Sequence, residues 1–136
     1  MFGLRRCVAL AVICAAAASL LGPALANERV FPFDRELMLD AAPMRGSKRI
    51  PIIQIAANGA ASIDLWCNSL RGKASVGEDS LTIVPEGAAT AQCAPERQSG
   101  DESLLAALAQ ITNWRRHGDV IEFIGARTLR FRLMTN

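Results

Sequence analysis

The side chains that could carry covalent or metal chemistry are few in this chain and far apart. The 136 residues include four cysteines and a single histidine, His117. Zinc sites are built from Cys and His ligands at short spacing, such as Cys-x-x-Cys or His-x-x-x-His, and the sequence has neither pattern. It also lacks a glycine-rich loop of the kind that cradles phosphate. We therefore expect no metal site and no cofactor.

Catalysis through His117 would need a nucleophile held against the ring and a carboxylate to orient it. His117 falls between apolar runs in a predicted hairpin. Nothing in the sequence brings a serine or cysteine and a carboxylate to that hairpin. We therefore expect no catalytic residues, and we expect that the protein is not an enzyme.

The adjacent carboxylates Asp101 and Glu102 have a structural interpretation. Ser99 followed three residues later by Glu102 matches a capping box, so we place the first turn of a helix here. Negative charge in a first turn favours the helix dipole. The apolar residues that follow have helical spacing, and they are Leu104, Leu105, Leu108 and Ile111. This pattern predicts one amphipathic helix from about residue 100 to about residue 111.

The first 26 residues have the pattern of a signal peptide. Arg5-Arg6 precede an apolar run that ends at Leu21, and Ala24-Leu25-Ala26 is the small-x-small pattern that signal peptidase cleaves. The apolar run is shorter than the ~20 residues that a spanning helix needs. Lipid anchoring through Cys14 is disfavoured, because this cysteine does not follow a small residue. We expect a periplasmic or secreted protein of one domain, residues 27–136, without a transmembrane segment.

Removing this leader changes the charge and the cysteine count. Two arginines leave with it, so 13 basic residues face 13 acidic residues in the mature chain. A net charge of zero gives no argument for a nucleic-acid partner. Cys67 and Cys93 are the cysteines that remain, and in an oxidising compartment an even number indicates a disulfide. We predict that these two residues form the one disulfide of the domain.

The mature chain otherwise consists of short apolar runs separated by turn residues. Asn58-Gly59 is a strong hairpin signal, and Asn68-Ser69 should form a corner between two strands. We interpret residues 27–32 as a loose leader and residues 42–49 as a loop. The predicted strands are residues 36–39, 50–56, 62–66, 70–76, 80–84, 88–92 (weakly), 113–117, 120–124 and 128–134. About 7–8 short strands with one helix predict a mainly β fold (α+β if the helix is counted), a small curled or barrel-like antiparallel sheet.

In this order, the motifs of the chain resemble those of the META-domain (HslJ-like) family over roughly residues 36–134. The matching motifs are Cys67-Asn68-Ser69-Leu70-Arg71-Gly72, Leu81-Thr82-Ile83, Thr90-Ala91-Gln92-Cys93, the helix 104–111 and the closing strands 120–133. Trp66 stands where the family usually has Gly, and Leu37 and Leu39 stand where it tends to have Trp. The resemblance makes Trp66, Asn68 and Gly72 structural motif residues. It implies a barrel-like domain of the bacterial envelope without catalytic residues, in a family with some members linked to envelope stress.

The last three predicted strands are rich in arginine. Strand alternation places Arg130 and Arg132 on one face, and Arg127 lies just before them. One interpretation is a solvated face that discourages pairing between sheet edges. The other is a docking site for an anionic envelope lipid or an acidic envelope protein.

These observations lead to two functional hypotheses. The first is a secreted, non-enzymatic META-like protein that acts as a binding or stress and envelope-maintenance module. The alternative is an inhibitor of a secreted hydrolase, of the protease or lysozyme type, because small disulfide-linked barrels can present rigid loops. Residues 42–49 and 95–100 are the candidate inhibitory loops.

We predict that export removes residues 1–26. Protein recovered from the periplasm should have the intact mass of a chain that begins at Asn27, because the peptidase pattern ends at Ala26. Mass spectrometry of the unreduced protein tests this. A mass that still includes the leader, or that carries a lipid on Cys14, would contradict the prediction.

Overall fold

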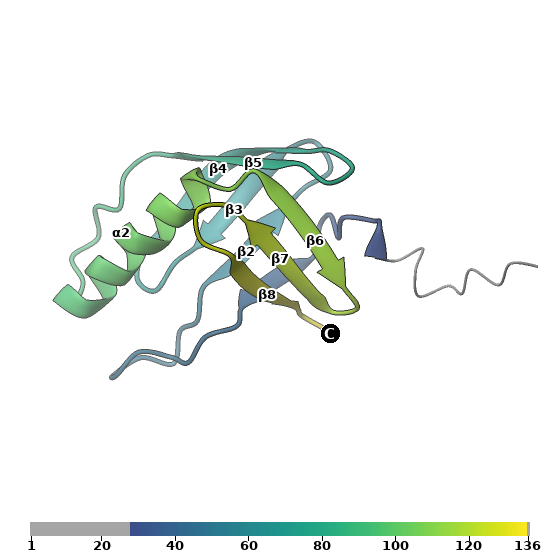
Figure 1. Cartoon of the computed structure of the whole chain (residues 1–136). Coiled ribbons are helices and arrows are strands. Elements are labelled where there is room, and N and C mark those ends of the chain that lie inside the picture. The colour runs from purple at the N-terminus through teal and green to yellow at the C-terminus, as the bar shows by residue number, and fades with distance from the viewer. Residues whose placement is uncertain (1–27, 136) are drawn as a thin grey trace, which may run out of the picture.

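The computed structural model describes residues 28–135, an eight-stranded antiparallel sheet and one helix (Figure 1). The predicted signal peptide and its cleavage site lie outside the described residues. The elements are β1 (Glu36–Leu39), β2 (Ile52–Ile55), β3 (Ala60–Asp64), β4 (Ser69–Val76), β5 (Leu81–Glu86), α2 (Pro95–Ala109), β6 (Asn113–His117), β7 (Val120–Ile124) and β8 (Leu129–Leu133). The prediction of a mainly β fold with one helix is confirmed.

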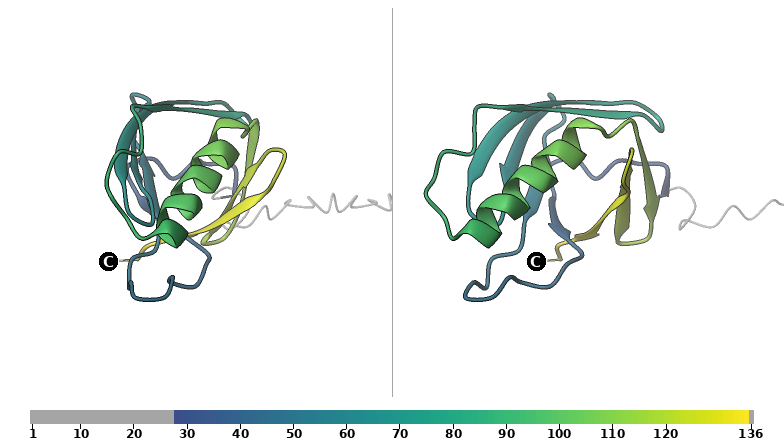
Figure 2. Two further views of the ribbon diagram at one scale, coloured as in Figure 1. Left: turned by 90° about the vertical axis from the view of Figure 1, so that its left-hand side faces the viewer. Right: turned by 60° about the vertical axis from the view of Figure 1, so that its left-hand side comes forward.

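The sheet is curled so that its two outer strands approach each other. Its strand order is β5-β4-β3-β2-β1-β8-β7-β6, and every pairing between neighbours is antiparallel. At the start of β5 and β6, a single bridge joins Ser80 to Asn113, and Leu81 N–H donates to Thr112 O at 2.9 Å. Helix α2 lies across one end of the curled sheet (Figure 2). The fold is therefore barrel-like, as predicted, with an end that the helix covers.

Alternation along the strands separates the core from the surface. In β8, Leu129 and Phe131 are buried whereas Arg130 and Arg132 are exposed, as the sequence predicts. The core is completed by the inner face of α2. Its buried apolar residues are Leu104, Ala107 and Leu108.

The end of the barrel away from α2 is filled by the segment before β1. Phe31 is only 5% exposed, and its ring lies 5.1 Å from that of Trp114 and 6.4 Å from that of Phe123. Pro32 is buried as well. The prediction that residues 27–32 form a loose leader is therefore wrong for Phe31 and Pro32, because an aromatic cluster holds them.

Two further predictions about the middle of the chain are wrong. Residues 88–92 do not form a strand, and the helix begins at Pro95 rather than near residue 100. The residue before its first turn is Ala94, and no side chain caps the helix. Proline is favoured at the first helical position because that N–H needs no partner there. This start places Ser99 inside the helix, so the capping box does not form.

Gly72 has a steric reason to be glycine. It is buried in β4 opposite Pro85 of β5. A Cβ atom at this position would lie 2.8 Å from the carbonyl oxygen of Val84, so a larger residue would push β5 away. The structure thus gives this motif residue a role in bringing β4 and β5 close together.

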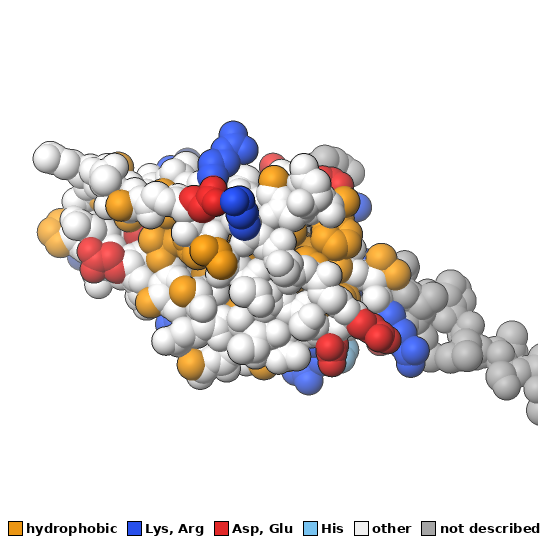
Figure 3. All heavy atoms as spheres, turned by 90° about the horizontal axis from the view of Figure 1, so that it is seen from above, with side chains coloured by type: hydrophobic (Ala, Val, Ile, Leu, Met, Phe, Trp, Pro, Cys, Tyr) orange, Lys and Arg blue, Asp and Glu red, His pale blue; other side chains and the backbone are white. Residues whose placement is uncertain are grey.

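The outer surface over β4 and β5 carries few charges. Figure 3 shows charged side chains of both signs in small groups there, with apolar side chains between them. Lys73 and Glu86 form an ion pair at 3.4 Å, and Val84 is 56% exposed. This face therefore presents no broad basic patch of the kind that binds nucleic acid.

We predict that the aromatic filling of the barrel end stabilises the domain. Phe31→Ala should lower the free energy of unfolding by about 3 kcal/mol, since it removes a buried aromatic ring. The melting temperature should fall by roughly 10 °C or more, measured by circular dichroism. Val30→Ala is the matched control, because Val30 is 57% exposed and its loss should cost less than about 0.5 kcal/mol. Equal melting temperatures for the two variants would contradict the role of Phe31.

Candidate functional site

The corner between β3 and β4 is held by hydrogen bonds and by a disulfide. Leu65 N–H donates to Asn68 O at 2.7 Å, which closes the turn. Cys67, at its tip, forms a disulfide with Cys93, 26 residues further along the chain and 6.2 Å away between Cα atoms. The predicted disulfide is confirmed, and it ties the corner to the segment that leads into α2.

A buried carboxylate on α2 fixes the backbone of this corner. Asp101 is 0% exposed, and it accepts hydrogen bonds from Cys67 N–H (3.2 Å), Asn68 N–H (2.8 Å) and Asn68 Nδ2 (2.8 Å). The other side-chain atom of Asn68, Oδ1, accepts from Ala91 N–H at 2.8 Å. Asn68 thus joins the corner, the segment before the helix and the helix itself.

The interpretation of Asp101 as a first-turn residue is therefore wrong. It lies in the second turn of α2, and its partners are in the β3–β4 corner rather than at the helix terminus. Glu102 is exposed, on the outer face of the helix. A sequence signal existed: Asp101, Leu104 and Leu108 share one helix face by their spacing, so Asp101 belongs to the buried side.

Arg49 holds the same corner from outside, which the sequence did not reveal. Its guanidinium donates to Cys67 O at 3.0 Å, to Asn68 O at 3.1 Å and to Ser69 Oγ at 2.8 Å. Arg49 thus donates to the carbonyl groups of Cys67 and Asn68, and the N–H groups of the same two residues donate to Asp101. This leaves the backbone of the corner little freedom to move.

Trp66 leaves this corner toward the helix and packs on Gly100. Trp66 is 7% exposed, and a Cβ atom on Gly100 would lie 2.9 Å from the Cδ1 atom of its indole. The absence of a side chain at residue 100 is what allows α2 to approach the ring. The bulk of Trp66 is therefore matched by a glycine on the helix.

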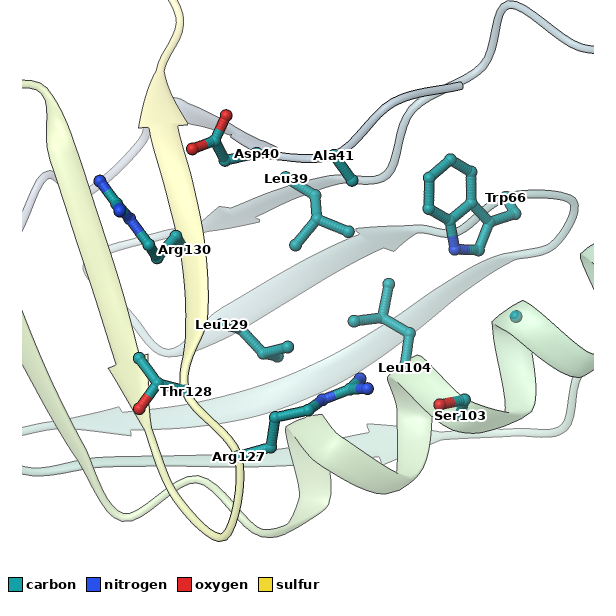
Figure 4. A pocket seen from close by; sticks show the side chains of 11 residues that line it. Leu39, Asp40, Ala41, Trp66, Ser103, Leu104, Arg127, Thr128, Leu129 and Arg130 are labelled. Carbon is teal, nitrogen blue, oxygen red and sulfur yellow. The ribbon is translucent and has the colours of Figure 1, made fainter. Parts of the chain in front are cut away.

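Trp66 forms one wall of a cleft between α2, the end of β1 and the start of β8 (Figure 4). The cleft has a volume of about 430 Å³, within the range of small-molecule sites. Its lining residues are Leu39, Asp40, Ala41, Trp66, Gly100, Ser103, Leu104, Arg127, Thr128, Leu129 and Arg130. The floor is apolar, and polar side chains surround it.

The polar groups of the cleft are mostly hydrogen-bond donors. Arg127 extends toward the helix side of the cleft, and the nitrogen-bearing edge of Trp66 faces the helix (Figure 4). The one carboxylate in the lining, Asp40, is held by Arg132 at 3.2 Å. Ion pairs formed within residues 28–135 do not include Arg127. The cleft thus has a cation and no free anion to balance it.

The structure places the three arginines predicted as a docking face in two settings. Arg130 lies 4.0 Å from Glu122, which also pairs with Arg115, and Arg132 pairs with Asp40. These pairs belong to the solvated face that the strand alternation predicted. Arg127 instead lines the cleft, where Arg130 joins it at the edge.

The side chains that could do other chemistry are not arranged for it. His117 is exposed at the end of β6, opposite Val120 of β7. Cys67, Cys93 and Asp101 place potential metal-ligand atoms within 4.8 Å of one another. In this arrangement the sulfurs are bonded to each other and both Asp101 oxygens accept hydrogen bonds, so the cluster acts as a structural link.

These features define a class of protein: a small curled antiparallel barrel with one helix across its end and a disulfide-linked corner packed on that helix. The chain belongs to the META domain family, whose model matches residues 35–135. No curated protein and no solved structure matches it. Within residues 28–135, no helix has the length and apolarity needed to cross a membrane.

We predict that Asp101 is essential for the corner. Asp101→Asn keeps the shape but presents an amide N–H₂ group to N–H donors, so it should lower the free energy of unfolding by about 3 kcal/mol. Glu102→Gln removes the same charge from the exposed neighbour and should cost less than about 0.5 kcal/mol. Urea denaturation of the two variants measures the difference. Similar midpoints would mean that the carboxylate does not support the corner.

Proposed function

We propose that this chain is an exported, non-enzymatic binding domain of the bacterial envelope, and that it binds its partner in the cleft beside Trp66. The observation that carries the proposal is the set of donors around an apolar floor, without an unpaired carboxylate. The leader pattern and the disulfide both favour an oxidising compartment outside the cytoplasm. A role in envelope maintenance or stress would follow from binding an envelope component.

The chemistry of the lining supports binding rather than catalysis. Ser103 and Thr128 bring hydroxyl groups to the cleft, but a hydroxyl nucleophile needs a base beside it. The lining has no histidine, and Asp40 is engaged by Arg132. The groups in place can orient and neutralise a ligand, which is the work of a binding site.

The partner that suits this cleft carries negative charge. Arg127 offers a planar fork of donors that matches carboxylate and phosphate groups. The apolar floor would hold an adjoining uncharged part of the partner. An acidic segment of an envelope protein and an anionic lipid both offer a negative charge beside an apolar part, and so does a smaller amphiphilic anion.

The inhibitor hypothesis is supported by one of its two candidate loops. The β1–β2 loop, which contains residues 42–49, projects from the body of the domain (Figure 2). Ser47 N–H donates to Met44 O at 3.1 Å, and Arg49 anchors the loop to the corner. Residues 95–100 are helical and do not form the second loop. Inhibition of a secreted protease or lysozyme by the mature domain would favour this alternative.

We predict that a photo-crosslinker at Ser103, in the cleft, captures the partner in living cells. The same crosslinker at Thr82, exposed on the outer side of β5, should capture nothing specific. Arg127→Gln should abolish the Ser103 adduct, whereas Arg71→Gln, on exposed β4, should leave it unchanged. Gel mobility and intact mass detect a protein or a small-molecule adduct. Equal adducts at residues 103 and 82 would contradict the proposed site.

A further inference from the structure

We infer that the ligand of the cleft is a small amphiphilic carboxylate, a molecule with one carboxylate group on an apolar body. The inference rests on the proposed function, because it takes the cleft beside Trp66 to be a binding site. It specifies the charge, the geometry and the size of the ligand. Each of these follows from a different set of lining residues.

The negative charge follows from two donors that have no partner within residues 28–135. Arg127 takes part in no ion pair there, and no hydrogen bond from the Trp66 indole N–H is formed. The other tryptophan shows the contrast, since Trp114 Nε1 donates to Gly77 O at 3.1 Å. The Trp66 N–H is not among the fully buried side-chain donors that lack a partner, so solvent or a ligand in the cleft can reach it. An anion between Arg127 and Trp66 would therefore accept from both groups.

A single negative charge fits better than two. Arg130, the second cation at the cleft, shares Glu122 with Arg115, and Asp40 brings a carboxylate to the rim. One free guanidinium matches the two oxygens of a carboxylate in a bidentate pair. A phosphate monoester would bring a second negative charge, for which the lining has no free cation, because Arg130 already lies 4.0 Å from Glu122. The charge balance therefore favours a carboxylate.

The apolar body follows from the floor of the cleft. Leu39, Leu104 and Leu129 come from β1, α2 and β8, and the indole ring of Trp66 completes the surface. A cleft of about 430 Å³ accommodates a small molecule or the end of a chain. Burying an apolar group here gains roughly 25 cal/mol per Å² of surface removed from water. The carboxylate then gives orientation, and the apolar part gives much of the affinity.

The probe for this inference is 4-phenylbutyrate, which carries one carboxylate on an apolar body. Amide spectra of the ¹⁵N-labelled mature domain have two indole signals, from Trp66 and Trp114, because the chain has two tryptophans. The Trp66 signal should shift and saturate as the probe is added, and the Trp114 signal should stay in place. 4-Phenylbutanol, which lacks the charge, and 4-phenylbutyl phosphate, which carries more, should each bind at least about tenfold more weakly.

Variants then identify the group that recognises the charge. Arg127→Gln should weaken 4-phenylbutyrate binding at least about tenfold, and Arg71→Gln should not change it. Equal affinity for the alcohol, or unchanged binding by Arg127→Gln, would overturn the inference. Tighter binding of the phosphate would overturn it in favour of a phosphate ligand. If the Ser103 crosslink forms and depends on Arg127 but 4-phenylbutyrate does not bind, the carboxylate ligand is rejected and the binding site stands. If the crosslink and the 4-phenylbutyrate binding are both absent, the ligand and the binding site are both rejected.

Discussion

The arrangement of helix and barrel depends on the hydrogen bonds that the buried carboxylate of Asp101 accepts from the β3–β4 corner. A buried anion is costly unless hydrogen bonds replace its lost water, and here N–H groups of Cys67 and Asn68 do so. Because these donors sit in the β3–β4 corner, the requirement to satisfy Asp101 fixes how α2 lies on the sheet. The disulfide and Arg49 hold the same corner from other directions. Trp66, and with it one wall of the cleft, takes its position from this corner.

The accuracy of the sequence predictions varied with the range of the interactions involved. The strands were predictable because alternation and turn residues are local, as β8 and the Asn58-Gly59 hairpin show. The helix start was wrong because Pro95 and Ser99 both offered local start signals, and the sequence did not indicate which one prevails. Asp101 and Phe31 were misassigned because their partners lie about 33 and 83 residues away along the chain. The cleft is assembled from segments far apart in sequence, so no single motif could reveal it.

The arginines show how tertiary context separates residues that a sequence pattern groups together. Arg130 and Arg132 share the outer face of β8, as alternation requires, and acidic side chains from β7 and the end of β1 neutralise them. Exposed ion pairs of this kind contribute little to stability, but they reduce the charge available to a partner. Arg127 is only three residues away, yet the bend before β8 turns it into the cleft. The number of arginines in a segment is therefore a poor guide to its capacity to bind anions.

Phe31 has a consequence for the start of the mature domain. The ring that fills the barrel end precedes the matched family region, which begins at residue 35, and it follows the predicted cleavage site by only four residues. Four extended residues span about 14 Å at most. In a chain cleaved after Ala26, the new N-terminus would therefore lie within this distance of Phe31, and the Phe31 ring would tie the start of the mature domain to the barrel end.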